Sequence, residues 1–299
     1  MLLAFDWTQL AQQTVIGLAS GGVWATLAVA LVLIYRSTGV VNFAQGEMAM
    51  FSTFIAWGLI QAGLPLGAAL ALTLVLSFLG GMVIERVIIR PVEGGEPLVL
   101  VIVTLGLLIL LNSGAGWIWG FGNRSFPSLF GNDSIEVAGV RIDVESLGIV
   151  AVMLTVVGLV FLFTQRTKLG LAMRAVAMNP ESSRLSGIAV GRTLMVGWGL
   201  AAAVGALAGA LIAPRLFLDV NFMGGVLIYA FAAATLGGFD SPLGAVVGGW
   251  IIGVAETLAG NYVGFIGSDL KILVPLAIIL VVLLIRPSGL FGSQEVARA

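Results

Sequence analysis

The side chains in this sequence that could do chemistry are few, and they lie in or beside long apolar runs. Glu47 and Glu256 are acids within such runs. A charged carboxylate in hydrocarbon is costly, so such a residue faces a water-filled cavity, pairs with another group or binds a proton. Together with neutral polar residues of the same runs, these acids predict the wall of a solute pathway. The predicted pathway residues are Asn42, Gln45, Glu47, Thr104, Asn112 and Glu256.

Both acids also have a structural interpretation. Gly39 and Gly46 flank the residues before Glu47 and indicate a helix that starts irregularly. Irregular backbone at membrane depth is tolerated where it is buried in protein or lines a cavity. The free N–H groups of that helix start could face an anionic solute, or Glu47 could cap them. Glu256 is either part of the pathway or a polar clamp between helices.

The composition excludes several kinds of chemistry. The 299 residues contain no Cys and no His, which rules out thiol catalysis, disulfides, histidine acid–base chemistry and Cys/His metal sites. Lysine occurs only as Lys168 and Lys271, and neither lies in the G-x-x-x-x-G-K-[ST] motif of an ATP-binding P-loop. The net charge of −1 provides no basic footprint for nucleic acid. We therefore expect no enzyme activity, no bound metal or cofactor, and no nucleic-acid partner.

The elements that must position these side chains are membrane-spanning helices. Hydrophobic residues make up 59% of the chain and charged residues 10%, against roughly 25% charged in a soluble domain. One span uses about 20 mostly apolar residues, which leaves room for about nine spans. We predict an all-α, polytopic transmembrane helix bundle of 8-9 spans, forming one domain over residues 1–299. The candidate spans are 15–35, 40–61, 65–84, 98–119, 146–164, 193–213, 224–239, 242–260 and 271–285.

The basic residues predict the orientation, because Lys and Arg favour the cytoplasmic side. With the N-terminus out and the C-terminus in, ten of the 14 Lys and Arg residues fall on inner segments. Segment 85–97 fits this least well, since it carries two Arg and three Glu. The first apolar run is too long, and has too few flanking basic residues, for a cleaved signal peptide. The expected location is the bacterial cell (inner) membrane, which the chain would cross several times.

Two connections are longer than turns. The outer loop 120–145 alternates apolar and polar residues around position 139, which predicts a β-hairpin. It is either a lid over the helix ends or a platform for an extracytoplasmic partner. The inner segment 165–192 contains helical material, then Asn179 as a predicted N-cap and Pro180 at the first helical position. Leu171, Arg174, Ala175 and Met178 share one face of the first helix, which would lie on the bilayer or dock into a cytoplasmic protein.

Small residues form stripes on two of the predicted helices. Positions 197, 201, 205 and 209 carry Gly, Ala, Gly and Gly, and glycines at 244, 248, 249 and 253 behave similarly. Such stripes mark close helix crossings, either within one chain or between two membrane subunits. Similar glycine-rich motifs near residues 77–106 and 205–237 suggest an inverted repeat, which in transporters places the pathway between the halves.

Four motifs resemble one family of membrane proteins. Tyr35-Arg-Ser-Thr-Gly-Val-Val-Asn-Phe-Ala-Gln-Gly-Glu-Met48 resembles the N-F-A-H-G-E signature of LivH-type permeases, the membrane subunits of ATP-binding-cassette importers for branched-chain amino acids. The segments 170–188, 235–245 and 286–292 are also similar to that family, and the resemblance covers essentially the whole chain. Gln45 departs from the usual His, which puts in doubt any role of a titrating group there.

The resemblance implies a function and partners. The chain would be a permease subunit that translocates branched-chain or related amino acids by alternating access. Its partners would be a second, LivM-like permease, two ABC ATPase subunits that use ATP and Mg, an extracytoplasmic substrate-binding protein and the lipid bilayer. Segment 165–192 would be the cytoplasmic coupling segment that fits a groove on the ATPase. Its expected coupling residues are Gly170, Arg174, Asn179, Pro180, Glu181, Arg184, Gly187 and Ile188.

Three alternatives remain open on the sequence. The family's solutes also include urea, amides and other small molecules, so the motif does not fix the ligand. A secondary transporter or channel would share the apolar spans, although the chain has little material for a proton relay. A scaffolding membrane subunit would also fit the long inner segment.

Overall fold

The computed structural model describes residues 7–131, 133–137, 139–267 and 269–292, and most of them are helical. A short two-stranded hairpin, β1 (Ser134–Val137) with β2 (Val140–Asp143), confirms the hairpin predicted in the outer loop. The helices are α1 (Trp7–Thr38), α2 (Gln45–Gln61), α3 (Leu66–Ile84), α4 (Pro97–Trp119), α5 (Val144–Arg166), α6 (Lys168–Met178), α7 (Pro180–Leu185), α8 (Val190–Leu216), α9 (Phe222–Gly237), α10 (Pro242–Tyr262) and α11 (Leu273–Ile285).

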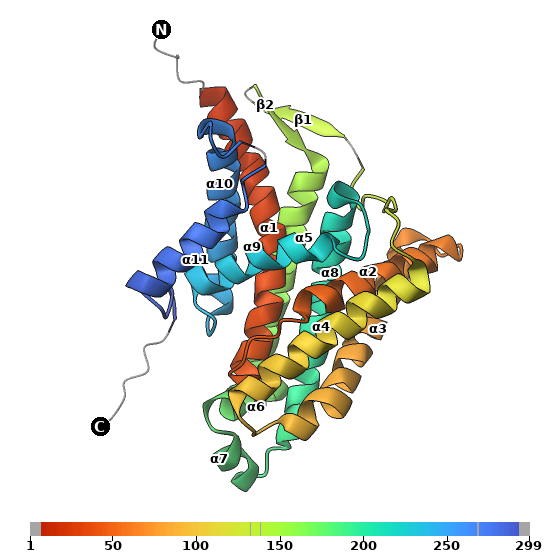
Figure 1. Ribbon diagram of the computed structural model, residues 1–299, viewed down its shortest axis with the longest axis vertical. Coiled ribbons are helices and arrows are strands. Elements are labelled where there is room, and N and C mark those ends of the chain that lie inside the picture. The colour runs from red at the N-terminus through yellow and green to blue at the C-terminus, as the bar shows by residue number, and fades with distance from the viewer. Residues whose placement is uncertain (1–6, 132, 138, 268, 293–299) are drawn as a thin grey trace.

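Helix α1 forms the centre of the bundle (Figure 1). It packs against α5, α8, α9 and α10, and every residue from position 21 to position 34 is buried. This stretch is apolar on all sides, which is the pattern of a helix enclosed by protein rather than one with a polar, solvated face. In contrast, α3 and α4 expose rows of large apolar side chains, as expected for helices that face lipid or another membrane protein.

The stripe of small residues on α8 packs inside the chain. A Cβ atom on Gly205 would lie 2.5 Å from Nε2 of Gln45, and one on Gly209 would overlap Thr53. Both neighbours belong to α2, so the small residues allow α2 and α8 to approach closely. The alternative of a dimer interface is therefore wrong for Gly205 and Gly209.

The stripes on α10 also serve internal packing. Gly249 faces Ala25 of α1, where an added Cβ would lie 2.6 Å from the alanine Cβ. Gly248 faces the backbone of Ala233 in α9, and Gly253 faces Gly21 of α1. Helix α10 thus lies between α1 and α9 at distances that larger side chains would not permit.

The predicted spans correspond to helices, but not all are long. Within the described ranges, six helices are long and apolar enough to cross a membrane: α1, α3 with its extension to Val92, α4, α5, α8 and α10. The apolar helices α9 and α11 are shorter, with 16 and 13 residues, and α2 has 17. The fold is a polytopic α-helical membrane bundle.

Several predicted boundaries differ from the structure, and two of them affect the regions described below. The second run was expected from residue 40, but α2 begins at Gln45, because Gly39 has a φ of +69° and an Asn42-centred turn follows it. The inner loop predicted from residue 85 continues instead as a π-helix, Glu85–Ile89, and a 3₁₀ turn, Arg90–Val92.

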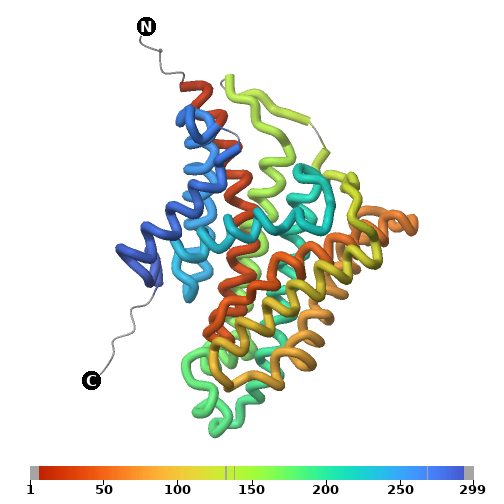
Figure 2. Tube along the Cα trace, in the orientation of Figure 1, coloured from red at the N-terminus to blue at the C-terminus, as the bar shows by residue number. Residues whose placement is uncertain are grey.

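The two long connections lie at opposite ends of the molecule. The hairpin is beside the first turns of α1, where the N–H of Arg141 donates to the side chain of Gln12. Helices α6 and α7 lie at the other end, next to the end of α1 (Figures 1 and 2). The predicted topology places segments 120–145 and 165–192 on opposite sides of the membrane, which requires this arrangement.

Candidate functional site

Asn42 organises the irregular chain before α2. Its side chain is 1% exposed, and its Oδ1 atom accepts a hydrogen bond from the N–H of Ala44 at 3.0 Å. Its Nδ2 atom donates to Oε1 of Gln45 and to Sδ of Met48, each at 3.4 Å. The amide therefore holds the turn that leads into α2, and the irregular helix start predicted from the glycines is confirmed.

Gln45 joins α2 to α8. It is fully buried, and its Nε2 atom donates to the carbonyl of Ala201 at 3.0 Å. The Nε2 atom also packs directly against Gly205, where a Cβ atom would overlap it, so the side chain is held on both sides. An enclosed amide in this position stabilises the α2–α8 contact.

Glu47 lies in the first turn of α2 and is 7% exposed. Its hydrogen-bond partner among the described residues is Asn112 of α4, whose Nδ2 atom donates to Oε2 at 3.3 Å. The Asn112 amide also donates to the carbonyl of Val220 at 2.8 Å and lies 3.4 Å from Oδ1 of Asn221. Glu47 therefore does not cap the start of α2. Instead, its contact with Asn112 joins α2, α4 and the chain before α9.

The surface beside Asn112 is polar and open. Asn221 is exposed, and Cβ atoms added to Gly224 or Gly225 would meet open space. The adjoining surface of α4 is apolar, with Leu110 62% exposed. A polar patch within an apolar membrane surface is typical of a region that faces a pathway or another protein rather than lipid.

A backbone pairing holds the chain that supplies the Val220 carbonyl. The N–H of Arg124 donates to the carbonyl of Leu218 at 2.9 Å, and the N–H of Leu218 donates back at 2.8 Å. Phe217 just before it has a φ of +60°, which is rare for a residue with a side chain. Neither Asn221 nor this turn was predicted from the sequence, although Asp219 and Asn221 between two apolar runs were a usable signal.

Thr104 and Glu256 do not join the Glu47–Asn112 contact. Thr104 of α4 is buried, donates to the carbonyl of Val101 at 2.9 Å, and lines a small cavity with Asn42 and Trp198. Glu256 lies on α10, where Tyr229 of α9 hydrogen bonds to it and Lys271 attracts its carboxylate.

The Tyr229 ring is itself held in place. It stacks on Trp24 of α1, with ring centroids 4.6 Å apart and planes inclined by 12°. Glu256 is therefore connected through Tyr229 to the central helix. This is the arrangement expected of a polar clamp between α9, α10 and α1.

Segment 165–192 contains two short helices, α6 and α7, that project from the bundle. Asn179 caps α7, since its Oδ1 atom accepts a hydrogen bond from the N–H of Ser182 at 2.8 Å, and Pro180 occupies the first helical position. Both features were predicted. Gly187, with a φ of +81°, and Ile188 end α7, donating to the carbonyls of Arg184 and Ser183 in the Schellman pattern.

The exposed side of this segment carries both apolar and charged side chains. Met178 is 87% exposed and Leu185 is 91% exposed. The opposite side anchors the segment: Val176 packs with Val190 and Leu194 of α8. Glu181 and Arg184 are exposed, so the segment presents an apolar and charged surface away from the bundle.

Two further expected coupling residues help to anchor the segment. Gly170 is buried where a Cβ would overlap the end of α5, and its N–H is capped by the hydroxyl of Thr167 at 2.9 Å. Arg174 is half-buried and donates to Oε1 of Gln165 at 2.8 Å. Among the described residues, no group of three or more acidic side chains is arranged to hold a metal ion.

Comparisons with known proteins place these features in one family. Residues 13–283 match the model of the permease component of the branched-chain amino acid transport system. The permease protein BraD of a high-affinity branched-chain amino acid transport system in Pseudomonas aeruginosa is 32% identical over 305 residues, covering 96% of this chain and 97% of that one. The corresponding permease LivH of Escherichia coli is 31% identical over 303 residues, with the same coverage.

Proposed function

Because this chain belongs to the family of permease components of branched-chain amino acid transport systems, we propose that it is the membrane-spanning permease subunit of an ATP-binding-cassette importer. The solutes are branched-chain or related amino acids, as in the names of BraD and LivH. The family and the six long apolar helices make the chain a multi-pass protein of the cell inner membrane.

ATP and Mg are used by partner chains, and this chain is the transport subunit rather than the enzyme. The observation that carries this proposal is the projecting α6–α7 unit, with Met178 and Leu185 almost fully exposed. Such an apolar surface on a structured, capped unit is suited to a protein groove. It favours a transporter coupled to a cytoplasmic ATPase over one that works without ATP.

The remaining subunits follow from the same proposal. The complex contains a second, LivM-like permease, two ATPase subunits and an extracytoplasmic substrate-binding protein.

We infer a topology of eight to nine spans with the N-terminus out and the C-terminus in, within a single domain over residues 1–299. The location of segments 120–145 and 165–192 at opposite ends supports it.

The solute passes between the permease subunits along the polar surface next to Asn112, Glu47 and Asn221. Support comes from the partial exposure of Asn112 and from the open glycines beside it. Asn42, Gln45 and Thr104 hold the start of α2 and the neighbouring α4 in register behind this surface, and Glu256 braces α9.

The test is reconstitution of the purified native complex in liposomes, with leucine uptake and ATP hydrolysis measured together. We expect the binding protein loaded with leucine to stimulate ATP hydrolysis and uptake. In the Asn112→Leu complex, uptake should fall roughly tenfold, the effect of about 1.4 kcal/mol of lost interaction. The adjacent exposed position provides the control, since Ser113→Ala should transport normally.

Three results would count against the proposal. Native purification without an ATPase chain would argue against the importer. Uptake driven by a proton gradient without ATP would favour the secondary transporter. Normal uptake by assembled complexes with both Asn112→Leu and Glu47→Ala would remove the pathway from this surface.

A further inference from the structure

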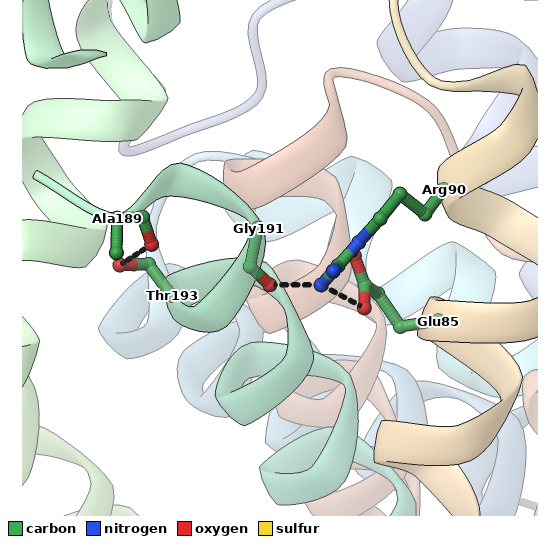
Figure 3. A network of polar contacts seen from close by, with 5 residues as sticks. All are labelled: Glu85, Arg90, Ala189, Gly191 and Thr193. Carbon is green, nitrogen blue, oxygen red and sulfur yellow. Dashed lines mark hydrogen bonds and ion pairs between the residues drawn. The ribbon is translucent and has the colours of Figure 1, made fainter.

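A partly buried ion pair lies where the α3 helix ends (Figure 3). The Glu85 side chain is 1% exposed, and Arg90 donates to both of its oxygens: Nη2 to Oε2 at 2.8 Å and Nε to Oε1 at 3.2 Å. The same Nη2 atom donates to the carbonyl of Gly191 in α8 at 2.5 Å. One guanidinium thus binds an acid in its own segment and the backbone of another helix.

The π-helix explains how these two residues meet. In an α-helix, residues five apart point about 140° away from each other, because each residue turns the helix by about 100°. In the π-helix Glu85–Ile89, the N–H of Arg90 donates to the carbonyl of Glu85, so the wider turn brings the fifth residue back over the first. The side-chain pair and the backbone bond therefore stabilise the same local geometry.

Gly191 completes the contact from the α8 side. A Cβ atom on Gly191 would lie 2.9 Å from Cζ of Arg90 and 3.0 Å from its Nη2 atom. The absence of a side chain at the second residue of α8 is therefore what lets the guanidinium reach the helix backbone. Substituting this glycine would displace Arg90 without changing any charge.

The contact adjoins the coupling segment. Helix α8 starts at Val190, directly after the turn that ends α7. A second charge links the same elements: partial burial raises the pKa of the Glu93 carboxyl, and the positive charges of Arg184 in α7 and of Arg90 oppose that rise. Segment 85–97 carries three acids and two arginines, and it fitted poorly with the expected excess of basic residues on inner segments. Some of these charges thus form a structural network.

The other side of this network leads to the pathway. After the 3₁₀ turn, the chain enters α4 at Pro97, and α4 carries Asn112. A displacement of α7 and the start of α8 can therefore reach Asn112 through Arg90 and the rigid helix α4. Coupling between distant sites needs such a chain of packed or hydrogen-bonded groups, or a shared two-state element.

We propose that Arg90, held by Glu85 and seated on Gly191, is a positioning residue that couples movement of the α6–α7 segment to the α3–α4 hairpin. The proposal rests on the proposed function. It adds a second way for movement of α7 to reach the bundle, besides the direct connection of α7 to α8 along the chain. When the latch formed by Glu85, Arg90 and Gly191 is intact, ATP-driven displacement of α7 also moves α4 and opens or closes the pathway surface.

The experiment measures uptake and ATP hydrolysis in the reconstituted complex and takes their ratio. Arg90→Lys keeps the positive charge but loses the planar fork that binds two carboxylate oxygens and a carbonyl. We expect leucine transported per ATP to fall roughly tenfold, within the range typical of coupling between sites. Gly191→Ala should lower the same ratio, although it alters the other side of the latch.

Arg86→Lys is the matched control, because Arg86 is exposed on the same π-helix, and its ratio should equal that of the wild type. If Arg90→Lys and Gly191→Ala keep the wild-type ratio, the latch does not couple. If uptake and hydrolysis fall in parallel with the amount of assembled complex, its role is only structural and the proposal is overturned. A wild-type complex without substrate-stimulated hydrolysis would instead refute the proposed function itself.

Discussion

Gly81 of α3 lies directly against the backbone of Trp198 in α8: a Cβ atom on Gly81 would be 2.5 Å from the Trp198 carbonyl oxygen. The same Cβ would lie 2.7 Å from Cβ of Ala202. The preceding residue, Gly80, is exposed and has open space around it. Two adjacent glycines in one helix therefore have opposite packing environments, which makes them a matched pair.

Gly81→Ala should destabilise the protein by about 1–3 kcal/mol, because helices α3 and α8 would have to separate. Gly80→Ala should be neutral or stabilising by up to about 1 kcal/mol, since alanine favours the helix and nothing opposes its methyl group. Thermal unfolding of the two variants in the same detergent measures the difference. Equal melting temperatures would mean that α3 and α8 are not in close contact.

The cap of α7 gives a second prediction. Asn179→Ala removes the acceptor for the Ser182 N–H and should cost about 0.5–2 kcal/mol locally, whereas Asn179→Ser retains a capping oxygen. Hydrogen exchange at Ser182 should therefore accelerate in the alanine variant and much less in the serine variant. If the segment docks into the ATPase, the alanine variant should also retain less ATPase on purification, with serine close to the wild type.

The Tyr229–Glu256 contact gives a third prediction. Tyr229→Phe keeps the ring stacked on Trp24 but removes the hydroxyl group that bonds to Glu256. We expect the stability to fall by about 1–3 kcal/mol, as for a lost hydrogen bond to a charged group. Uptake per assembled complex should stay near the wild-type value, because the contact is a clamp. A large loss of uptake with unchanged stability would place Glu256 in the pathway instead.

Much of the local structure could be predicted from the sequence, because its causes are local. The runs of apolar residues predicted helices, and helices occur at all nine positions. The Asn179-Pro180 pair predicted a capped helix start, and alternation around position 139 predicted a hairpin. These signals depend on residues a few positions apart, so the tertiary structure was not needed to interpret them.

The local patterns failed where the tertiary structure changes the helix geometry. The apolar run ends before the charged residues of segment 85–97, so it placed the end of a helix at residue 84 and could not anticipate the π-helix that pairs Glu85 with Arg90. It also grouped Leu171 and Met178 on one face without indicating whether that face is buried. In the structure both are exposed, and Val176 faces the bundle instead.

The sequence by itself determined that this chain is a helical membrane protein without cysteine or histidine and with a long basic segment between two apolar runs. Only the tertiary structure decided which polar groups meet. Glu47 and Asn112 are separated by 65 residues, and Arg90 and Gly191 by 101. It also showed that the glycine stripes serve contacts within the chain. The physical reason is that a side chain's partner is set by how helices cross, and a helix crossing depends on surfaces contributed by distant parts of the sequence.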